Sequence, residues 1–123
     1  MDRQLVVRDM PFPDCPIRNV LARIADKWSL LVLYTLSLHN RPVRFKELQR
    51  SVPDISQKML TTTLRTLEQD GYVRREVFAE VPPRVEYSAT KLTASLIPHL
   101  NALFDWAFDN MAVIVKSRAD HSS

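Results

Sequence analysis

The sequence predicts a mainly α-helical domain with a small β-hairpin wing, a winged helix-turn-helix that carries further helices at its N- and C-terminal ends. Two observations support this fold class. Residues 45–69 have the period of two amphipathic helices, interrupted by a Pro-Asp pair at 53–54. After the Asp-Gly pair at 70–71 the hydrophobic period changes to two, and prolines at 82–83 divide the alternating residues into two strands. Helix, turn, helix and hairpin follow one another in the order that this fold requires.

Composition limits the possible functions. The 123 residues suffice for one domain, and 46% hydrophobic with 25% charged residues is ordinary for a globular protein. No apolar run reaches membrane-spanning length and the N-terminus lacks the apolar core of a signal peptide, so we expect a cytoplasmic protein without a membrane span. One cysteine and three scattered histidines offer no metal-ligand spacing, and a single glycine excludes a phosphate-cradling loop. With no nucleophile–base pair in evidence, we predict no enzyme, no metal and no cofactor.

The N-terminal third is predicted to form an arm and two helices. Residues 1–14 have no sustained period and should be an irregular arm, whereas Pro16 suits the first turn of a helix. That helix carries an apolar stripe, made of Ile17, Val20, Leu21 and Ile24. A second helix, capped by Asp26, covers residues 28–38 and is apolar nearly all round, so we expect it to be covered on every side. A buried strand is the alternative for so short a run.

The second helix of the helix-turn-helix, about residues 56–70, divides its residues sharply between two faces. Leu60, Leu64 and Leu67 lie on one side, as a core-facing stripe requires. The other side is polar and cationic, and such side chains can read base edges in a DNA major groove. The predicted base-reading residues are Gln57, Lys58, Thr61, Thr62 and Arg65. A merely solvated helix face is the alternative.

Basic charge is concentrated around this helix. Residues 41–91 hold ten Lys or Arg against seven Asp or Glu, which accounts for the whole net charge of +3. Clustered positive charge is an electrostatic footprint for nucleic-acid phosphates. We assign four residues to contacts with the DNA backbone, one of them also being the helix cap: Arg44, Lys46, Ser56 and Arg84.

The wing is predicted over about residues 72–89. Charged residues alternate there with apolar ones, the pattern of a hairpin with one buried face, whose apolar members are Val73, Val77, Val85 and Tyr87. Arg75 interrupts this apolar set, and the sequence does not indicate where its side chain points. The prolines at 82–83 prevent ladder hydrogen bonds, so the tip should protrude with Arg84 beside it.

A last helix is predicted from about residue 93 to 116, followed by a frayed tail at 117–123. Its apolar residues cover more of the helix circumference than the end of a small domain normally buries, which indicates a partner. Pro98 either lies in the first turn or kinks a longer helix capped by Thr90.

Several short motifs occur in order along residues 15–112. They are Cys15-Pro16, Asp26-Lys27-Trp28, Arg44-Phe45-Lys46-Glu47-Leu48, Ile55-Ser56-Gln57-Lys58-Met59-Leu60, Pro83-Arg84-Val85-Glu86-Tyr87 and Leu96-Ile97-Pro98. With these motifs the chain resembles the HxlR-type bacterial transcriptional regulators, a winged-helix group within the wider MarR-like set. Thr93 and Ala107 depart from the pattern, because the family often has glycine at both positions.

The resemblance implies a regulator that binds double-stranded DNA at an inverted-repeat operator, as a homodimer, and represses or activates nearby genes. It implies pairing through the terminal helices, for which we name Ile17, Leu100, Leu103, Phe104, Ala107, Phe108 and Met111. Several relatives sense oxidants or electrophiles through a cysteine near the N-terminus, where this chain has Cys15.

Three alternatives stay open at this point. A position at a helix start and the nearby Arg18 would make the Cys15 thiol reactive, whereas Asp14 would oppose this, and an inert buried thiol is the alternative. The whole domain could instead be a winged-helix module that binds protein without DNA specificity. A hydrophobic pocket between the terminal helices could hold a small-molecule effector, but no residue specifies one.

Overall fold

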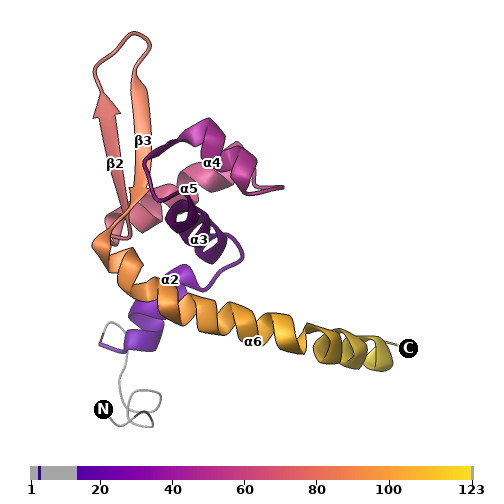
Figure 1. Ribbon diagram of the computed structural model, residues 1–123. Helices are drawn as coiled ribbons and strands as arrows, with labels where there is room; N and C mark the ends of the chain where they lie inside the picture. The colour runs from indigo at the N-terminus through magenta and orange to yellow at the C-terminus, as the bar shows by residue number, and fades with distance from the viewer. Residues whose placement is uncertain (1–2, 4–13, 123) are drawn as a thin grey trace.

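The computed structural model describes residue 3 and residues 14–122 and has the winged helix-turn-helix architecture, with a long helix at its C-terminal end (Figure 1). In chain order the elements are η1 (Ile17–Leu21), α2 (Ala22–Ile24), α3 (Ser29–His39), β1 (Val43–Arg44), α4 (Phe45–Ser51), α5 (Gln57–Gln69), β2 (Val73–Phe78), β3 (Arg84–Ala89) and α6 (Lys91–His121). The predicted fold class is confirmed. The predicted arm lies outside the described residues, apart from Arg3 and Asp14.

The first helical segment begins where proline predicts it. Pro16 has helical dihedral angles, and the Cys15 carbonyl accepts a hydrogen bond from the Asn19 N–H at 2.8 Å. Residues 17–21 form a π-helical turn before α2. Of the predicted apolar stripe, the remainder of the described fold covers only Ile24. The exposed members of the stripe are Ile17, Val20 and Leu21.

Asp26 caps α3 as expected. Its Oδ1 accepts hydrogen bonds from the N–H groups of Trp28 and Ser29, each at 2.9 Å, and its Oδ2 accepts one from the Ser29 hydroxyl at 2.5 Å. Burial disfavours the Asp26 carboxylate, but the hydrogen bonds from Ser29 and Trp28 together outweigh burial and hold the pKa of Asp26 below its usual value.

This cap predicts a pH-dependent loss of stability. A carboxyl whose pKa is lowered by folding adds stability above its unfolded pKa of about 4, and that stability is lost as the pH falls through the folded pKa. We expect Asp26→Ala to lower the free energy of unfolding by about 1 kcal/mol near neutral pH, and the difference from the wild type to shrink in acid. Urea unfolding at neutral pH and below the carboxyl pKa measures both values. Equal differences at the two pH values would contradict the assignment.

The segment after Asp26 is a helix, so the strand alternative is wrong, but α3 is not covered on every side. Helices α4, α5 and α6 and strand β3 pack around it and bury Val32, Leu33 and Leu36. Leu31 and Leu38 lie on the side that these elements leave open and are exposed. An all-apolar sequence has no polar face to mark the open side, which is why the prediction of full burial failed.

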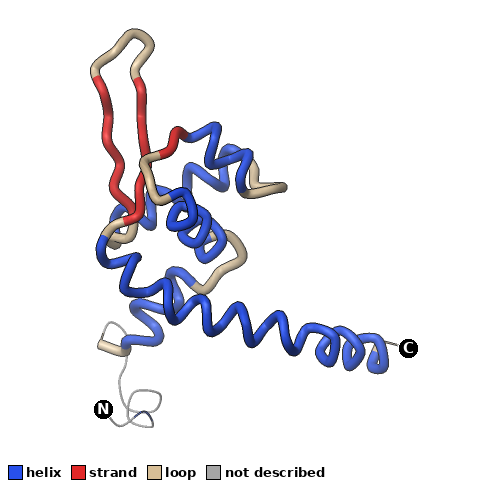
Figure 2. Tube along the Cα trace, viewed as in Figure 1, coloured by secondary structure: helices blue, strands red, loops and turns tan. Residues whose placement is uncertain are grey.

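The sheet has three antiparallel strands in the order β1-β3-β2 (Figure 2). Strands β2 and β3 form the predicted hairpin, with Val73 opposite Ala89 at its base and Val77 opposite Val85 further out. The hairpin projects beyond the helices in Figure 2, so its inner face is buried only at the base: Val73 is buried, whereas Val77 is exposed. Strand β1 was not predicted, because two residues are too few to show a period.

The helix-turn-helix is formed as predicted. Helix α4 ends before the Pro-Asp break, where Asp54 has a φ of 69°. The Ser56 hydroxyl oxygen caps α5 by accepting a hydrogen bond from the Met59 N–H at 3.0 Å. Gly71, with a φ of 85°, ends the helix in the left-handed region that favours glycine. The inward face of α5 is buried as expected, at Leu60, Leu64 and Leu67.

Helix α6 is longer than predicted at both ends. It starts at Lys91 and includes residues 117–121, which were expected to be a frayed tail. The prediction ended too early because those polar residues show no apolar period, although they form helix. Of the two alternatives for Pro98, the structure has the longer helix capped by Thr90. The buried Thr93 hydroxyl donates to the Tyr72 carbonyl at 2.6 Å, so this departure from the family pattern attaches α6 to the turn after α5.

Candidate nucleic-acid interface

The polar face of α5 is open to solvent. All five residues predicted to read bases are exposed on this helix: Gln57, Lys58, Thr61, Thr62 and Arg65. The opposite face packs on α3 and on the base of β2. The structure therefore gathers these five residues on one side of a helix whose other side is fixed in the core.

The residues assigned to the DNA backbone lie around this face. Arg44 and Lys46 are exposed where β1 passes into α4, and in the part of the chain that the structure describes neither one makes a salt bridge. Ser56 is exposed at the start of α5, where its hydroxyl oxygen is used by the Met59 N–H. The first two residues thus present positive charge that no salt bridge offsets at the start of α4, the first helix of the helix-turn-helix.

Arg84 is in a different situation, because it is engaged within the wing. Its guanidinium carbon lies 4.1 Å from the centroid of the Phe78 ring. Its nitrogens lie 3.4 Å from a Glu80 carboxylate oxygen and 3.6 Å from one of Glu86. Arg84 therefore holds the outer part of the hairpin together, and its charge is largely offset by two carboxylates.

Arg75 is a candidate site residue that sequence reasoning left unassigned. It pairs with Tyr87 across the hairpin, on the same side of β2 as Val73 and Val77. That side faces α5, and Arg75 lines a cavity of about 290 Å³ together with Thr61, Leu64, Arg65, Glu68 and Tyr87. The period of two predicts Arg75 on the inner face of the hairpin, but its charge argued against that position in the sequence analysis.

The C-terminal end of α5 is held from two directions. The Arg23 Nε donates a hydrogen bond to Asp70 Oδ2 at 2.5 Å, which links α2 to the residue directly after α5. From the other side, the Thr90 hydroxyl donates to the Gly71 carbonyl at 2.7 Å. Both terminal helical segments therefore fix the orientation of α5.

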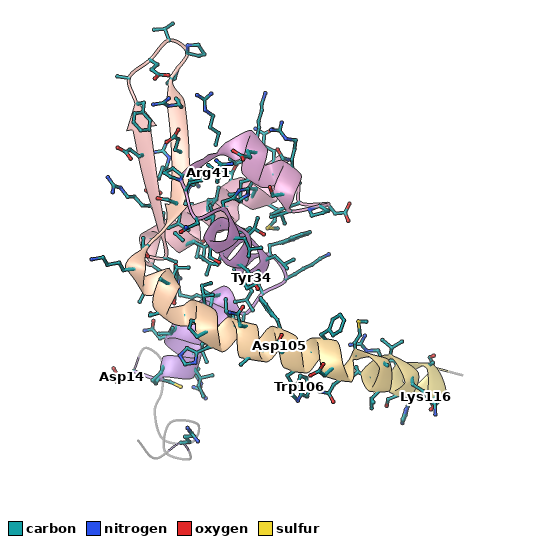
Figure 3. The ribbon with its side chains drawn as sticks, in the orientation of Figure 1. Asp14, Tyr34, Arg41, Asp105, Trp106 and Lys116 are labelled. Atoms are coloured by element: carbon teal, nitrogen blue, oxygen red, sulfur yellow. The ribbon has the colours of Figure 1, made fainter. Side chains whose placement is uncertain are left out.

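The C-terminal half of α6 projects from the fold, and Figure 3 shows Trp106 and Lys116 on it at a distance from α4, α5 and the wing. Apolar side chains of this half line a groove of about 380 Å³, among them Phe104, Ala107, Phe108, Met111, Ile114 and Val115. Of the other predicted interface residues, Ile17 and Leu103 are exposed. Leu100 is buried within the chain itself, so we leave it out of the interface.

Phe104 lines this groove and also contacts α3. Its ring packs edge-on against Tyr34, with the ring centroids 4.9 Å apart. This contact joins α6 to α3 at the point beyond which α6 projects.

Two further predictions concern Cys15 and a pocket for an effector. Cys15 lies directly before the first helical turn and is only 1% exposed. Between the terminal helices, where the pocket was predicted, Val20 of η1 and Leu92 of α6 line a cavity of about 330 Å³ together with Tyr72. A second cavity, of about 490 Å³, lies elsewhere, between α3, β3 and the start of α6. Within residues 3 and 14–122, no group of three or more His, Cys, Asp or Glu is arranged to hold a metal, and no helix is long and apolar enough to cross a membrane.

Comparisons with known proteins agree with this architecture. The model of the HxlR-like helix-turn-helix family matches residues 23–114. An HTH-type transcriptional regulator from Methanothermobacter thermautotrophicus is 48% identical over 92 residues, which are 75% of this chain and 69% of that protein. A structure described as a transcriptional regulator of the MarR family, from Porphyromonas gingivalis W83, is 35% identical with a TM-score of 0.70 over 84% of this chain and 99% of that one. The redox regulator HypR in its reduced form is 39% identical, with a TM-score of 0.72 over 82% and 98% of the two chains.

Proposed function

The chain belongs to the HxlR-like helix-turn-helix family of transcriptional regulators, and we propose that it acts as a homodimer on an inverted-repeat operator. The observation that carries the proposal is the open, polar and cationic face of α5, with the wing beside it. Regulation of genes at such an operator takes place in the cytoplasm, where we place the protein.

The proposal gives each part of the interface a role. The first turns of α5 enter the major groove, where Gln57, Lys58, Thr61 and Thr62 meet base edges. Arg44 and Lys46 bind phosphates on the flank and fix the register. The wing reaches the adjacent minor groove, with Arg84 near its tip. Arg65 is one turn further along α5 and lies next to the base of the wing.

Pairing of two copies is supported by the apolar surface that one chain leaves uncovered. Phe108 is 80% exposed at the groove on α6, and the apolar residues of η1 are exposed as well. Contiguous apolar surface of this kind marks an interaction site. The 31 residues of α6 extend about 46 Å, enough for one chain to reach a second copy bound one DNA turn away.

Selection from a random duplex library at moderate salt tests the function. We expect the retained DNA to be enriched in an inverted repeat, with half-site centres about one helical turn, roughly 34 Å, apart. Enrichment without any repeat would contradict the dimer. No enrichment from a folded sample, together with binding that does not weaken as salt rises, would favour the protein-binding alternative. If binding appeared only after a small molecule was added, the cavity between α3, β3 and α6 would be the first place to seek it.

A finer part of the proposal concerns Cys15, which we propose makes operator binding sensitive to thiol oxidants. Support comes from the similarity to the redox regulator HypR and from the position of Cys15 beside the exposed apolar residues of η1. Since the chain has one cysteine, oxidation would yield an intersubunit disulfide, a mixed disulfide or a sulfenate. Burial means that the reaction needs local opening, so it should be slow.

The matching experiment uses Cys15→Ser. Diamide should release the wild type from its operator over minutes to hours, and the release should be absent in the variant. Serine is nearly isosteric with cysteine and keeps the packing, so the affinity of the untreated variant for the operator serves as the control. The same diamide response in both proteins would leave Cys15 with a packing role only.

A further inference from the structure

A cleft between α5 and the base of the wing has the composition of an anion site. Its walls come from one stripe of α5, spaced three and four residues apart, and from a cross-strand pair of the hairpin, Arg75 and Tyr87. Buried Leu64 lies among the residues that line the cleft, whose volume is about 290 Å³. The cleft thus separates the helix that faces the major groove from the strands that lead to the wing tip.

The charge in this cleft is positive and uncompensated by ion pairs. Arg65 and Arg75 supply two guanidinium groups and Glu68 one carboxylate, a formal sum of +1. Among residues 3 and 14–122, neither arginine takes part in a salt bridge, although Arg74 lies 3.8 Å from Glu76 and Arg84 is held by two glutamates. Two arginines that line one cleft and make no salt bridge among the described residues suit a phosphate, which each guanidinium can bind through two N–H groups.

We infer that this cleft binds one phosphate of the DNA backbone, held by Arg75 of the wing and Arg65 of α5. The inference rests on the proposed function. A sugar-phosphate strand always runs between a major groove and the minor groove next to it, so a protein with α5 in one groove and the wing in the other meets that strand at the cleft between them. The polar face of α5 predicted that Arg65 reads bases, and this inference assigns it to a backbone contact instead. Its position in the third turn of α5, beyond the N-terminal residues that reach bases, agrees with this.

Arg75→Ala tests the inference, with Arg74→Ala as its matched control. The two arginines are adjacent on β2 and both exposed, but their side chains lie on opposite faces of the hairpin. We expect Arg75→Ala to weaken binding by roughly tenfold or more, and by the same factor for the operator and for random duplex, since phosphate contacts carry no sequence information. The slope of log affinity against log salt should fall by about one for each half-site. Arg74→Ala should stay within about twofold of the wild type.

Two further variants examine the other members of the cleft. Arg65→Ala should repeat the uniform loss, whereas a loss confined to the operator with a changed preference at one base pair would assign Arg65 to bases and overturn the shared site. Glu68→Gln should strengthen binding to both duplexes, because it removes the one negative charge in the cleft. If Arg75→Ala behaved like Arg74→Ala while the wild type bound its operator, the cleft would be wrong and the proposed function would stand. Failure of the wild type to bind any duplex would instead remove the proposed function.

Discussion

Phe108→Glu is expected to convert the proposed dimer into a monomer and to weaken operator binding by more than about 100-fold. Phe108 is 80% exposed in the single chain, on the groove side of α6. Burying a phenylalanine side chain at an interface contributes about 1.5–3 kcal/mol, and in a two-fold dimer the substitution acts twice. The new carboxylate must also be desolvated among apolar groups, which costs several kcal/mol more. Every 1.4 kcal/mol is a tenfold change in affinity, so a hundredfold loss is a low bound.

Val113→Glu is the matched control for this experiment. Val113 is 70% exposed on the same projecting half of α6, but five residues from Phe108 place it about 140° away around the helix. Both variants add one carboxylate to an exposed helical position, so they share any effect of charge on folding or on DNA. Sedimentation velocity should report a monomer for Phe108→Glu and a dimer for Val113→Glu. An unchanged dimer in the first variant, or equal dissociation in both, would refute the groove as the pairing surface.

The DNA-facing unit could be predicted in detail because each of its boundaries has a local chemical cause. Ser56 caps α5, the glycine at 71 ends it, and the leucines between them have a helical period. The polar face can be recognised because burying its polar and cationic side chains in a core would be unfavourable. These signals are contained in α5 and its two ends, so no knowledge of the rest of the fold was needed.

Other features depend on contacts that the sequence does not reveal. Strand β1 exists because Val43 pairs with Tyr87, which lies 44 positions further along the chain. Arg75 lies on the inner face of the hairpin, where an apolar residue was expected. A charged side chain is tolerated there because this part of the inner face borders an open cleft and not the core. The stripe of η1 was correctly seen as amphipathic, but amphipathicity does not distinguish a face covered by the same chain from one left for a partner.

Helix α3 has one side covered by the same chain and one side left open, so substitutions on the two sides can be compared. On the covered side, Leu33→Ala is expected to lower the free energy of unfolding by about 2–5 kcal/mol. Leu33 is 0% exposed and lies in the main core cluster with Leu60 and Leu64 of α5. Removing the three outer carbon atoms of the side chain there leaves a cavity that close-packed neighbours fill only in part. Because this core supports α5 from behind, we expect the variant to lose operator binding at temperatures where the wild type still binds.

Leu38→Ala, in the same helix, makes the identical chemical change on the open side. Leu38 is 68% exposed, so the substitution creates no cavity, and alanine is at least as good a helix former as leucine. We expect its unfolding free energy to stay within about 0.5 kcal/mol of the wild type. Urea unfolding of the two variants side by side therefore separates the covered from the open side of a helix whose sequence is apolar on both. A similar large loss in Leu38→Ala would mean that a second copy covers this side, and sedimentation of the variant would then show a weakened dimer.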